Sequence, residues 1–391
     1  MSSVGYNNRE LCFEQGPIRP PSEAKSLLVR ITRNCPWNKC LFCRTYKGET
    51  FSLRSLEEVK QDIETIKKIY DEIKAISWKL GLKGEVTEEA VHYLYHNPEE
   101  YASSFLSVAM WLYYGEGSVF LQDGNNLMVK AGDLVEILTL LKNTFPEITR
   151  ITSYARAKTI AKRKTVEELQ ALRIAGLSRI HIGLESGSDK VLEFVRKGVT
   201  AAEHIEAGRK VKEAGISLSE YVIPGLGGKK LSQEHALQTA RVLNAINPDF
   251  IRLRTLRVVD GAGLDEKAAS GEFKPISDEE VVREIRLMVE HLEGIDSYFV
   301  SDHILNLLEE VEGRLPKDKS RMLAVIDRFL ALPFEKKCNF RLGRRANIYH
   351  TLADLDNPKP YQQVDKALTQ IMGPDGDGLE EVINELSKRF V

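Results

Sequence analysis

The 391-residue sequence has little cysteine, and its charges almost cancel. Five cysteines are a sparse and odd set for a chain of this length, so a disulfide framework is excluded and free thiols in a reducing compartment are expected. The 55 basic and 57 acidic residues argue against binding of phosphate backbones by the whole surface. No run approaches the roughly 18 apolar residues of a membrane helix, and the N-terminus lacks the build of a secretion signal. We therefore expect a cytoplasmic protein without membrane association.

Strand-like and helix-like runs alternate from about residue 26 to residue 260. The strand-like runs are residues 26–32, 118–122, 148–154, 178–184, 216–223 and 250–258. Capping-box pairs predict helix starts at Ser55 with Glu58, Thr165 with Glu168 and Thr200 with Glu203, a further helix starts near Ser232, and Gly176 and Gly215 predict two helix ends. This alternation predicts an α/β fold with six parallel strands, as an open barrel or a doubly wound sheet.

Two segments break the alternation. Residues 78–115 are rich in tyrosine and tryptophan and are too long for a plain loop, so they predict one or two inserted helices. From residue 261 onward the pattern is mostly helical, for instance over 278–292 and 321–332. The expected organisation is an N-terminal arm (1–25), a barrel (26–260, with the helical insertion 78–115) and a helical cap or subdomain (261–391).

Three of the cysteines fall on one short segment directly after the first strand. Cys35, Cys40 and Cys43 have the spacing C-x4-C-x2-C. A structural zinc site takes four protein ligands, and electron-transfer iron–sulfur clusters are held by four thiolates. Three thiolates would leave one cluster iron with a free coordination position. Zinc, completed by Cys12, Cys338 or a distant histidine, is the alternative, but the end of a barrel strand is where active sites lie.

With the aromatic Phe42 before the last cysteine, this loop resembles that of the radical S-adenosylmethionine superfamily. Members typically carry C-x3-C-x2-C on a partial (β/α)6 barrel, so the first spacer here is one residue longer. The resemblance covers about residues 26–260. It implies a partial (β/α)6 TIM-like barrel and a single [4Fe-4S] cluster on Cys35, Cys40 and Cys43, with S-adenosylmethionine on the free iron.

Further motifs follow successive strands and support the same resemblance. Gln122-Asp123-Gly124-Asn125 stands where the family has a Gly-Gly-Glu-like turn, and residues 181–188 read HIGLESGS, similar to methylthiotransferase and Elongator-catalytic-subunit-like members. The resemblance implies cofactor contacts from Phe42, Asp123, Gly124, Asn125, Glu185, Ser186, Lys197 (or Arg196) and Gly225. Ser153 and Arg156, after the third strand, are additional candidates because side chains there reach a barrel mouth.

Strand alternation also predicts which polar side chains face the lumen. Apolar positions face outward under the helices, so His181, Glu185, Arg252 and Arg254 face inward. We take His181, Arg252 and Arg254 as candidate catalytic or substrate residues. Two free arginines predict a carboxylate- or phosphate-bearing substrate. The alternatives are a structural histidine, and arginines that extend to solvent or pair with Glu185. His303 is a further candidate if the C-terminal helices cover the barrel.

The resemblance implies reductive cleavage of S-adenosylmethionine to a 5′-deoxyadenosyl radical, which abstracts hydrogen from a substrate. An external reductant of the flavodoxin or ferredoxin type is expected, and the isolation of Cys12 and Cys338 predicts one cluster. The substrate stays open. A small anionic metabolite is favoured over RNA or protein because the net charge is near zero. The alternatives are an RNA-modifying radical enzyme, a non-catalytic iron–sulfur or zinc-binding protein, and a hydrolase or lyase with structural zinc.

Overall fold

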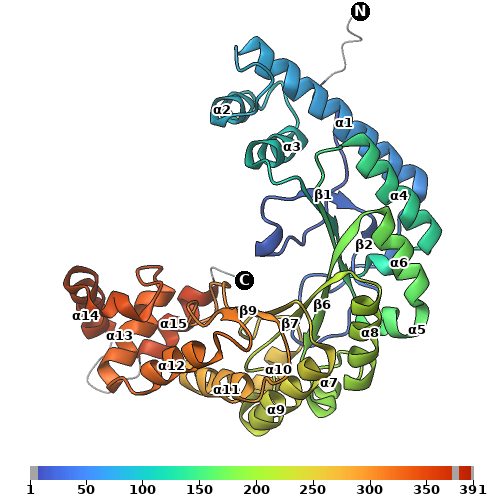
Figure 1. The fold of residues 1–391 in the computed structure, drawn as a ribbon. Helices are drawn as coiled ribbons and strands as arrows, with labels where there is room; N and C mark the ends of the chain where they lie inside the picture. The colour runs from blue at the N-terminus through green and yellow to red at the C-terminus, as the bar shows by residue number, and fades with distance from the viewer. Residues whose placement is uncertain (1–7, 372–377, 389–391) are drawn as a thin grey trace, which may run out of the picture. The chain divides into compact units, whose positions relative to one another are not determined.

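The computed structural model describes residues 8–371 and 378–388, which form two compact units (Figure 1). Of the described residues, the first unit comprises 8–36, 48–181 and 210–217, and the second comprises 37–47, 182–209, 218–371 and 378–388. The division falls between Pro36 and Trp37, within the cysteine loop. Residues 1–7 of the expected N-terminal arm lie outside the described residues.

The first unit is a parallel sheet with helices on it. Its strand order is β1 (Leu27–Arg30), β4 (Ser118–Gln122), β5 (Arg150–Ala155) and β6 (Leu177–Glu185), and the β1–β4 and β4–β5 pairs are parallel. A separate antiparallel pair joins β2 (Thr32–Arg33) to β3 (Ser52–Leu53). The helices are α1 (Leu56–Lys79), α2 (Glu88–His96), α3 (Ser103–Tyr114), α4 (Ala131–Thr144), α5 (Ala157–Arg163) and α6 (Val166–Ala175), with 3-10 turns at Pro21–Glu23 and Asn126–Met128.

In the second unit the order continues from β6, which runs through both units. It proceeds through β7 (Ser217–Val222), β8 (Phe250–Leu253) and β9 (Tyr298–Val300), which are parallel, to β10 (Gly313–Arg314), which is antiparallel to β9. The helices are α7 (Asp189–Phe194), α8 (Ala201–Glu213), α9 (Gly228–Ile246), α10 (Leu264–Ala269), α11 (Asp278–Glu290), α12 (Lys319–Leu330), α13 (Phe334–Arg345), α14 (Pro358–Ile371) and α15 (Gly378–Lys388), with a 3-10 turn at Leu352–Asp356.

The strand order confirms the α/β fold and selects the barrel-like form. A doubly wound sheet reverses its strand order at a switch point, whereas these strands follow one another in chain order. The sheet is open, since β1 and β10 stand at its two ends. It has eight strands rather than the expected six, because β9 and β10 are too short to show a periodic pattern in the sequence.

Local capping chemistry places several helices where the sequence predicts them. Ser55 and Glu58 form a full capping box at the start of α1, and Thr165 and Glu168 do so for α6. The expected helices of the 78–115 insertion are α2 and α3. The prediction near Ser232 is wrong, because α9 begins at Gly228, and the last predicted strand ends at Leu253 instead of Val258.

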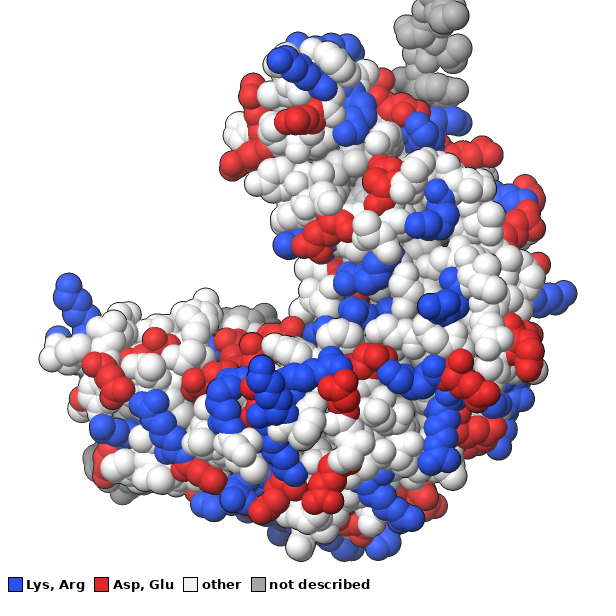
Figure 2. All heavy atoms as spheres, in the orientation of Figure 1, with Lys and Arg blue, Asp and Glu red and all other residues white. Residues whose placement is uncertain are grey.

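Acidic and basic side chains are interspersed over the face drawn in Figure 2, in keeping with the balanced composition. Among the described residues, no helix combines the length and apolar character needed to cross a membrane.

Candidate functional site

The three cysteines of the loop form no disulfide, and neither do Cys12 and Cys338. Cys40 is buried, whereas Cys35 and Cys43 are partly exposed. Within residues 8–371 and 378–388, no three His, Cys, Asp or Glu side chains are grouped as in a metal site, so the cysteine trio rests on the sequence pattern. Burial raises the pKa of Cys338, which keeps it a protonated thiol as expected for an isolated structural cysteine.

In the first unit, the turn after β4 lies against Cys35. A Cβ atom at Gly124 would stand 3.4 Å from the Cys35 Cβ and 3.6 Å from its Sγ, which is ordinary van der Waals contact, so this turn packs directly against the cysteine. The preceding Asp123 is fully buried and has a φ of 77°. Such a conformation costs a non-glycine residue about 1–3 kcal/mol and is often found at functional sites. The strained turn therefore lies beside Cys35.

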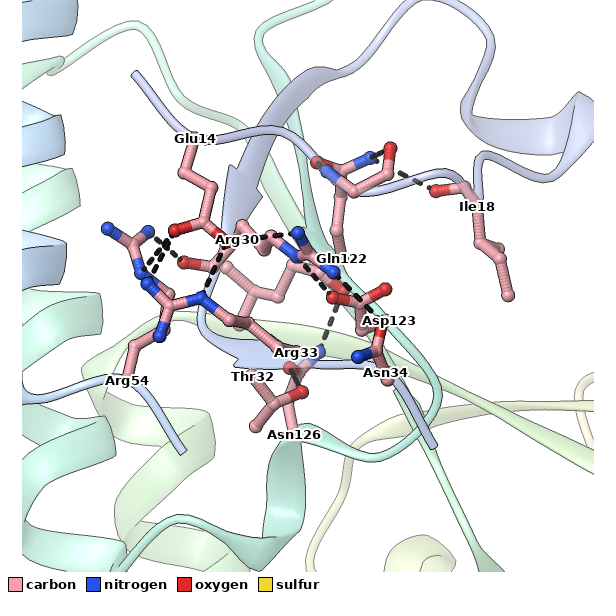
Figure 3. Close-up of polar contacts among 12 residues, drawn as sticks. Glu14, Ile18, Arg30, Thr32, Arg33, Asn34, Arg54, Gln122, Asp123 and Asn126 are labelled. Atoms are coloured by element: carbon pink, nitrogen blue, oxygen red, sulfur yellow. Dashed lines mark hydrogen bonds and ion pairs between the residues drawn. The ribbon is translucent and has the colours of Figure 1, made fainter. Parts of the chain in front are cut away.

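The Asp123 carboxylate is already paired within this unit (Figure 3). Arg30 on β1 donates its Nε–H to Asp123 Oδ2 at 2.6 Å. Gly16 packs against the same carboxylate, since a Cβ there would lie 2.9 Å from Asp123 Oδ1. The side chain of Asp123 therefore braces the turn, and the backbone of the turn is left as the group that can meet a ligand.

The N-terminal arm contributes to this turn in a way that the sequence did not indicate. Glu14 accepts hydrogen bonds from Arg30 at 2.9 Å and from Arg33 at 2.8 and 2.6 Å (Figure 3). The hydrogen bond from Arg33 lowers the pKa of Glu14 against the effect of burial. The Gln122 amide exchanges hydrogen bonds with the backbone of Gly16 at 2.8 and 2.9 Å. Residues 14–16 thus hold β1 and the β4 turn together.

The side chains predicted after β4 and β5 have protein partners. Asn125 is buried, donates to Thr159 Oγ1 at 2.8 Å and accepts the backbone N–H of Arg156 at 3.0 Å. Ser153 is also buried, and its hydroxyl donates to the Tyr154 carbonyl at 3.0 Å. These contacts fasten the turn to the start of α5.

In the second unit, the cysteine loop is anchored on the turn that follows α7. The Trp37 indole N–H donates to the Arg196 carbonyl at 2.7 Å, and the Leu41 N–H donates to the Val195 carbonyl at 2.9 Å. The ring of Trp37 fills the space above Gly198, where a Cβ would come within 2.2 Å of it. Gly198 also has a φ of 69°, so both the conformation and the close approach require glycine.

Glu185, Lys197 and Phe42 form a compact polar and aromatic cluster. Lys197 Nζ lies 2.7 Å from Glu185 Oε1 and 5.7 Å from the centre of the Phe42 ring. The chain turns sharply at Glu185, with a φ of 62°, and the Ser186 N–H donates back to the Leu184 carbonyl at 2.7 Å. The Glu185 carboxylate folds over Gly183, where a Cβ would lie 2.1 Å from Oε1. This cluster brings together three of the residues that the sequence predicts.

Glu220 on β7 was not singled out from the sequence. It is fully buried, and neither carboxylate oxygen has a hydrogen-bond partner among the described residues. Burial, together with repulsion from Glu185, raises the pKa of Glu220 well above its usual value, while Lys197 acts in the opposite direction. Burial and the Glu185 carboxylate therefore favour the neutral form of Glu220.

Ser186 and Gly225 are tied to α9 and α11. Ser186 is fully buried, and its hydroxyl lies 2.8 Å from His235 Nδ1 and accepts the Ser188 N–H at 3.0 Å. Gly225, with a φ of 89°, donates its N–H to Glu284 Oε1 at 2.6 Å. These bonds fix the turns after β6 and β7, and the sequence could not reveal them because the partners lie far along the chain.

The three candidate catalytic residues have different surroundings. His181 is fully buried in the first unit, where its Nε2 lies 3.4 Å from Glu23 Oε1, so its ring meets protein groups only. In the second unit, Arg252 lies 3.3 Å from Asp302 and over the Phe250 ring, whereas Arg254 is exposed. Arg252 pairs with Asp302 and not with Glu185, which was the expected alternative. The catalytic roles of His181, Arg252 and Arg254 stay predictions.

A cavity of about 430 Å³ lies in the second unit, among the segments that follow β7 and β8. Its lining includes Gly225 and the arginines Arg257, Arg341 and Arg345. Sequence reasoning missed these arginines, because Arg341 and Arg345 lie on α13, far from the barrel motifs in the chain.

Parts of the chain are similar to known proteins. Residues 106–240 match the model of the Radical SAM superfamily. A tRNA uridine(34) acetyltransferase of Methanocaldococcus jannaschii is 26% identical over 117 residues, 30% of this chain and 22% of that protein. One from Dehalococcoides mccartyi is 25% identical over 177 residues, 44% of this chain and 36% of that protein. The archaeal Elp3 structure from Methanocaldococcus infernus covers 54% of this chain and 51% of its own, with 16% identity and a TM-score of 0.37.

The chain thus spans only about a fifth to a third of the curated relatives that it matches. The family match begins at the insertion helix α3 and extends into α9, so it includes the turns after β4, β6 and β7 that carry the predicted motifs. Members of this superfamily use a [4Fe-4S] cluster and S-adenosylmethionine. The resemblance seen in the sequence is confirmed over residues 106–240, which match a radical SAM domain.

Proposed function

We propose that the chain is an enzyme that cleaves S-adenosylmethionine reductively and uses the resulting radical to abstract hydrogen from a substrate. The observation that carries the proposal is the three-cysteine loop, anchored through Trp37 and Leu41 on the turn that leads to Lys197. This anchoring joins the loop segment that contains Cys40 and Cys43 to the turn between α7 and Lys197, the partner of Glu185, all within the second unit.

The chain's own residues would bind and orient the cofactors. Cys35, Cys40 and Cys43 would hold the cluster as thiolates, and Gly124 lies directly against Cys35. When bound, the cluster and S-adenosylmethionine supply one-electron cleavage of the sulfonium, which yields methionine and a 5′-deoxyadenosyl radical.

Lys197 would bind the carboxylate of S-adenosylmethionine, either by releasing Glu185 or while still paired with it. Phe42 offers an aromatic face beside Lys197, and Gly225, with a φ of 89°, forms the turn after β7. Together these groups would grip the two ends of S-adenosylmethionine. A flavodoxin- or ferredoxin-type protein would deliver the electron.

RNA modification is the second candidate, because the relatives from both organisms carry the name tRNA uridine(34) acetyltransferase. The matched part is a minor portion of those proteins, so we keep a small anionic molecule as the first choice of substrate.

The test is anaerobic reconstitution with iron and sulfide, followed by incubation with dithionite and S-adenosylmethionine and quantification of 5′-deoxyadenosine. Wild type and Cys338→Ala should form it, because Cys338 is an isolated buried thiol, and Cys40→Ala should not. An intact cluster in the wild type without any 5′-deoxyadenosine would contradict the proposal.

A further inference from the structure

The cavity of about 430 Å³ in the second unit has the position and lining of a ligand site. It is bounded by the segment after β7, by residues 255–258 after β8, and by helices α11, α13 and α15. The carboxyl ends of parallel strands are where barrel enzymes bind their ligands. Its volume falls within the range of small-molecule pockets.

Three arginines line this cavity, but only two of them have acidic partners. Arg341 donates to Asp278 Oδ2 at 2.9 Å and to both carboxylate oxygens of Glu380, and Arg345 donates to Asp278 Oδ1 at 2.9 Å. Arg257 donates to the side chain and backbone oxygens of Asn384, which are neutral. Within the described ranges, no carboxylate forms an ion pair with Arg257.

Around Arg257 the basic side chains of the cavity outnumber the acidic ones, with three arginines against Asp278 and Glu380. Its Nε and that of Arg345 are buried and have no hydrogen-bond partner among the described residues. Burial and repulsion from Arg345 lower the pKa of Arg257, while Asp278 and Glu385 act in the opposite direction. Burial, with the charges of Arg254 and Arg345, also lowers the pKa of His303 to about 4, so this histidine is neutral and adds no further charge.

The rest of the lining is largely apolar, with Leu256, Ile276, Val281, Leu305 and Ile383 on the walls. A ligand that suits this cavity has an apolar body and one oxyanion that a guanidinium can bind through two parallel hydrogen bonds.

We propose that this cavity binds the carboxylate or phosphate group of a small molecule, with Arg257 as its principal partner, and that this molecule is the substrate. That this molecule is the substrate rests on the function proposed above, whereas the anion site follows from the cavity and its arginines alone. The arginines that recognise the substrate are then Arg257 and Arg345, in place of Arg252.

The test is calorimetric titration of the reconstituted full-length protein with inorganic phosphate and with succinate at constant ionic strength. At least one anion should bind saturably to the wild type, and the one that binds identifies the oxyanion. Arg257→Gln should weaken this binding about tenfold or more, because a hydrogen bond to a charged group is lost. Arg286→Gln is the matched control, since it removes a partly exposed, ion-paired arginine of the same unit, and it should bind like the wild type.

If Arg257→Gln does not fold, Arg257→Lys carries the test, because it keeps the charge but loses the paired geometry and should still bind several-fold more weakly. No saturable binding of either anion, or equal binding by wild type and variant, would overturn the site. A short RNA whose binding depends on Arg257 would overturn the assignment to a small molecule. Formation of 5′-deoxyadenosine by the wild type is scored separately, so loss of the anion site and loss of the proposed reaction are distinguishable.

Discussion

Replacing Gly198 by alanine should release the cysteine loop from its anchor. A Cβ at this position would lie 2.2 Å from the Trp37 ring, so the indole must leave its seat. Its hydrogen bond to the Arg196 carbonyl, 2.7 Å long, would be lost with it. The loop segment that contains Cys40 and Cys43 would then keep its hydrogen bonds from Leu41 to Val195 and from Leu264 to Leu41.

The size of the effect can be worked from these contacts. A left-handed conformation costs alanine about 1–2 kcal/mol, and Gly198 has a φ of 69°. The lost hydrogen bond contributes about 1 kcal/mol, and the displaced ring surface about 1 kcal/mol more. In the variant, the equilibrium constant between the released and the anchored form of the loop should therefore rise roughly 10- to 100-fold. This factor comes from the lost hydrogen bond and ring contact and does not include the cost of the backbone conformation.

Gly271→Ala is the matched control, because Gly271 has a φ of 76° and nothing lies within 4 Å of a Cβ there. Both variants carry the backbone cost, but only Gly198→Ala displaces Trp37. The assay is iron and sulfide content per chain after anaerobic reconstitution and desalting. Gly198→Ala should retain much less cluster than Gly271→Ala, and equal contents in the two variants would refute the anchoring role of Trp37.

Three further predictions concern single positions. In Gly183→Ala, the new Cβ would lie 2.1 Å from Glu185 Oε1 and 3.0 Å from Lys197 Nζ and would displace the carboxylate. The Kd for S-adenosylmethionine, measured by equilibrium dialysis, should then rise about tenfold. An unchanged Kd would show that the Glu185–Lys197 pair does not bind S-adenosylmethionine. Because the pKa of Glu220 is raised in the folded chain, the unfolded chain loses the Glu220 proton first as the pH rises above 4.5, and wild-type stability falls in that range. The gain in Tm caused by Glu220→Gln should therefore grow with pH. A gain that is independent of pH would contradict the raised pKa of Glu220. Ser55→Ala removes the cap of α1 and should lower the free energy of unfolding in urea by about 1 kcal/mol while iron content stays at the wild-type level.

Much of the fold could be predicted because its signals are local. A cap such as Ser55 with Glu58 needs only neighbours in the chain, and the buried face of α1 repeats at helical spacing. The short strands β9 and β10 carry no such signal, because a run of two or three residues is stabilised by the strand beside it and not by its own pattern.

The site was predicted in part for the same reason. The cysteine spacing and the Glu185–Lys197 pair lie within short stretches of chain. The partners of buried polar groups lie far away, as with Ser186 and His235, and no periodicity reveals them. The pairing of Arg252 with Asp302 depends on a contact between distant segments, and the pocket arginines of α13 could be found only once the chain was folded.

We propose that three cysteines hold a cluster with one iron left open for S-adenosylmethionine. The most direct test is the electron paramagnetic resonance spectrum of the dithionite-reduced, reconstituted protein, recorded with and without S-adenosylmethionine. We predict a [4Fe-4S]⁺ signal whose g values change on addition of S-adenosylmethionine and which is absent in Cys43→Ala. A cluster signal that S-adenosylmethionine leaves unchanged would show that all four irons are held by other ligands and would contradict the account.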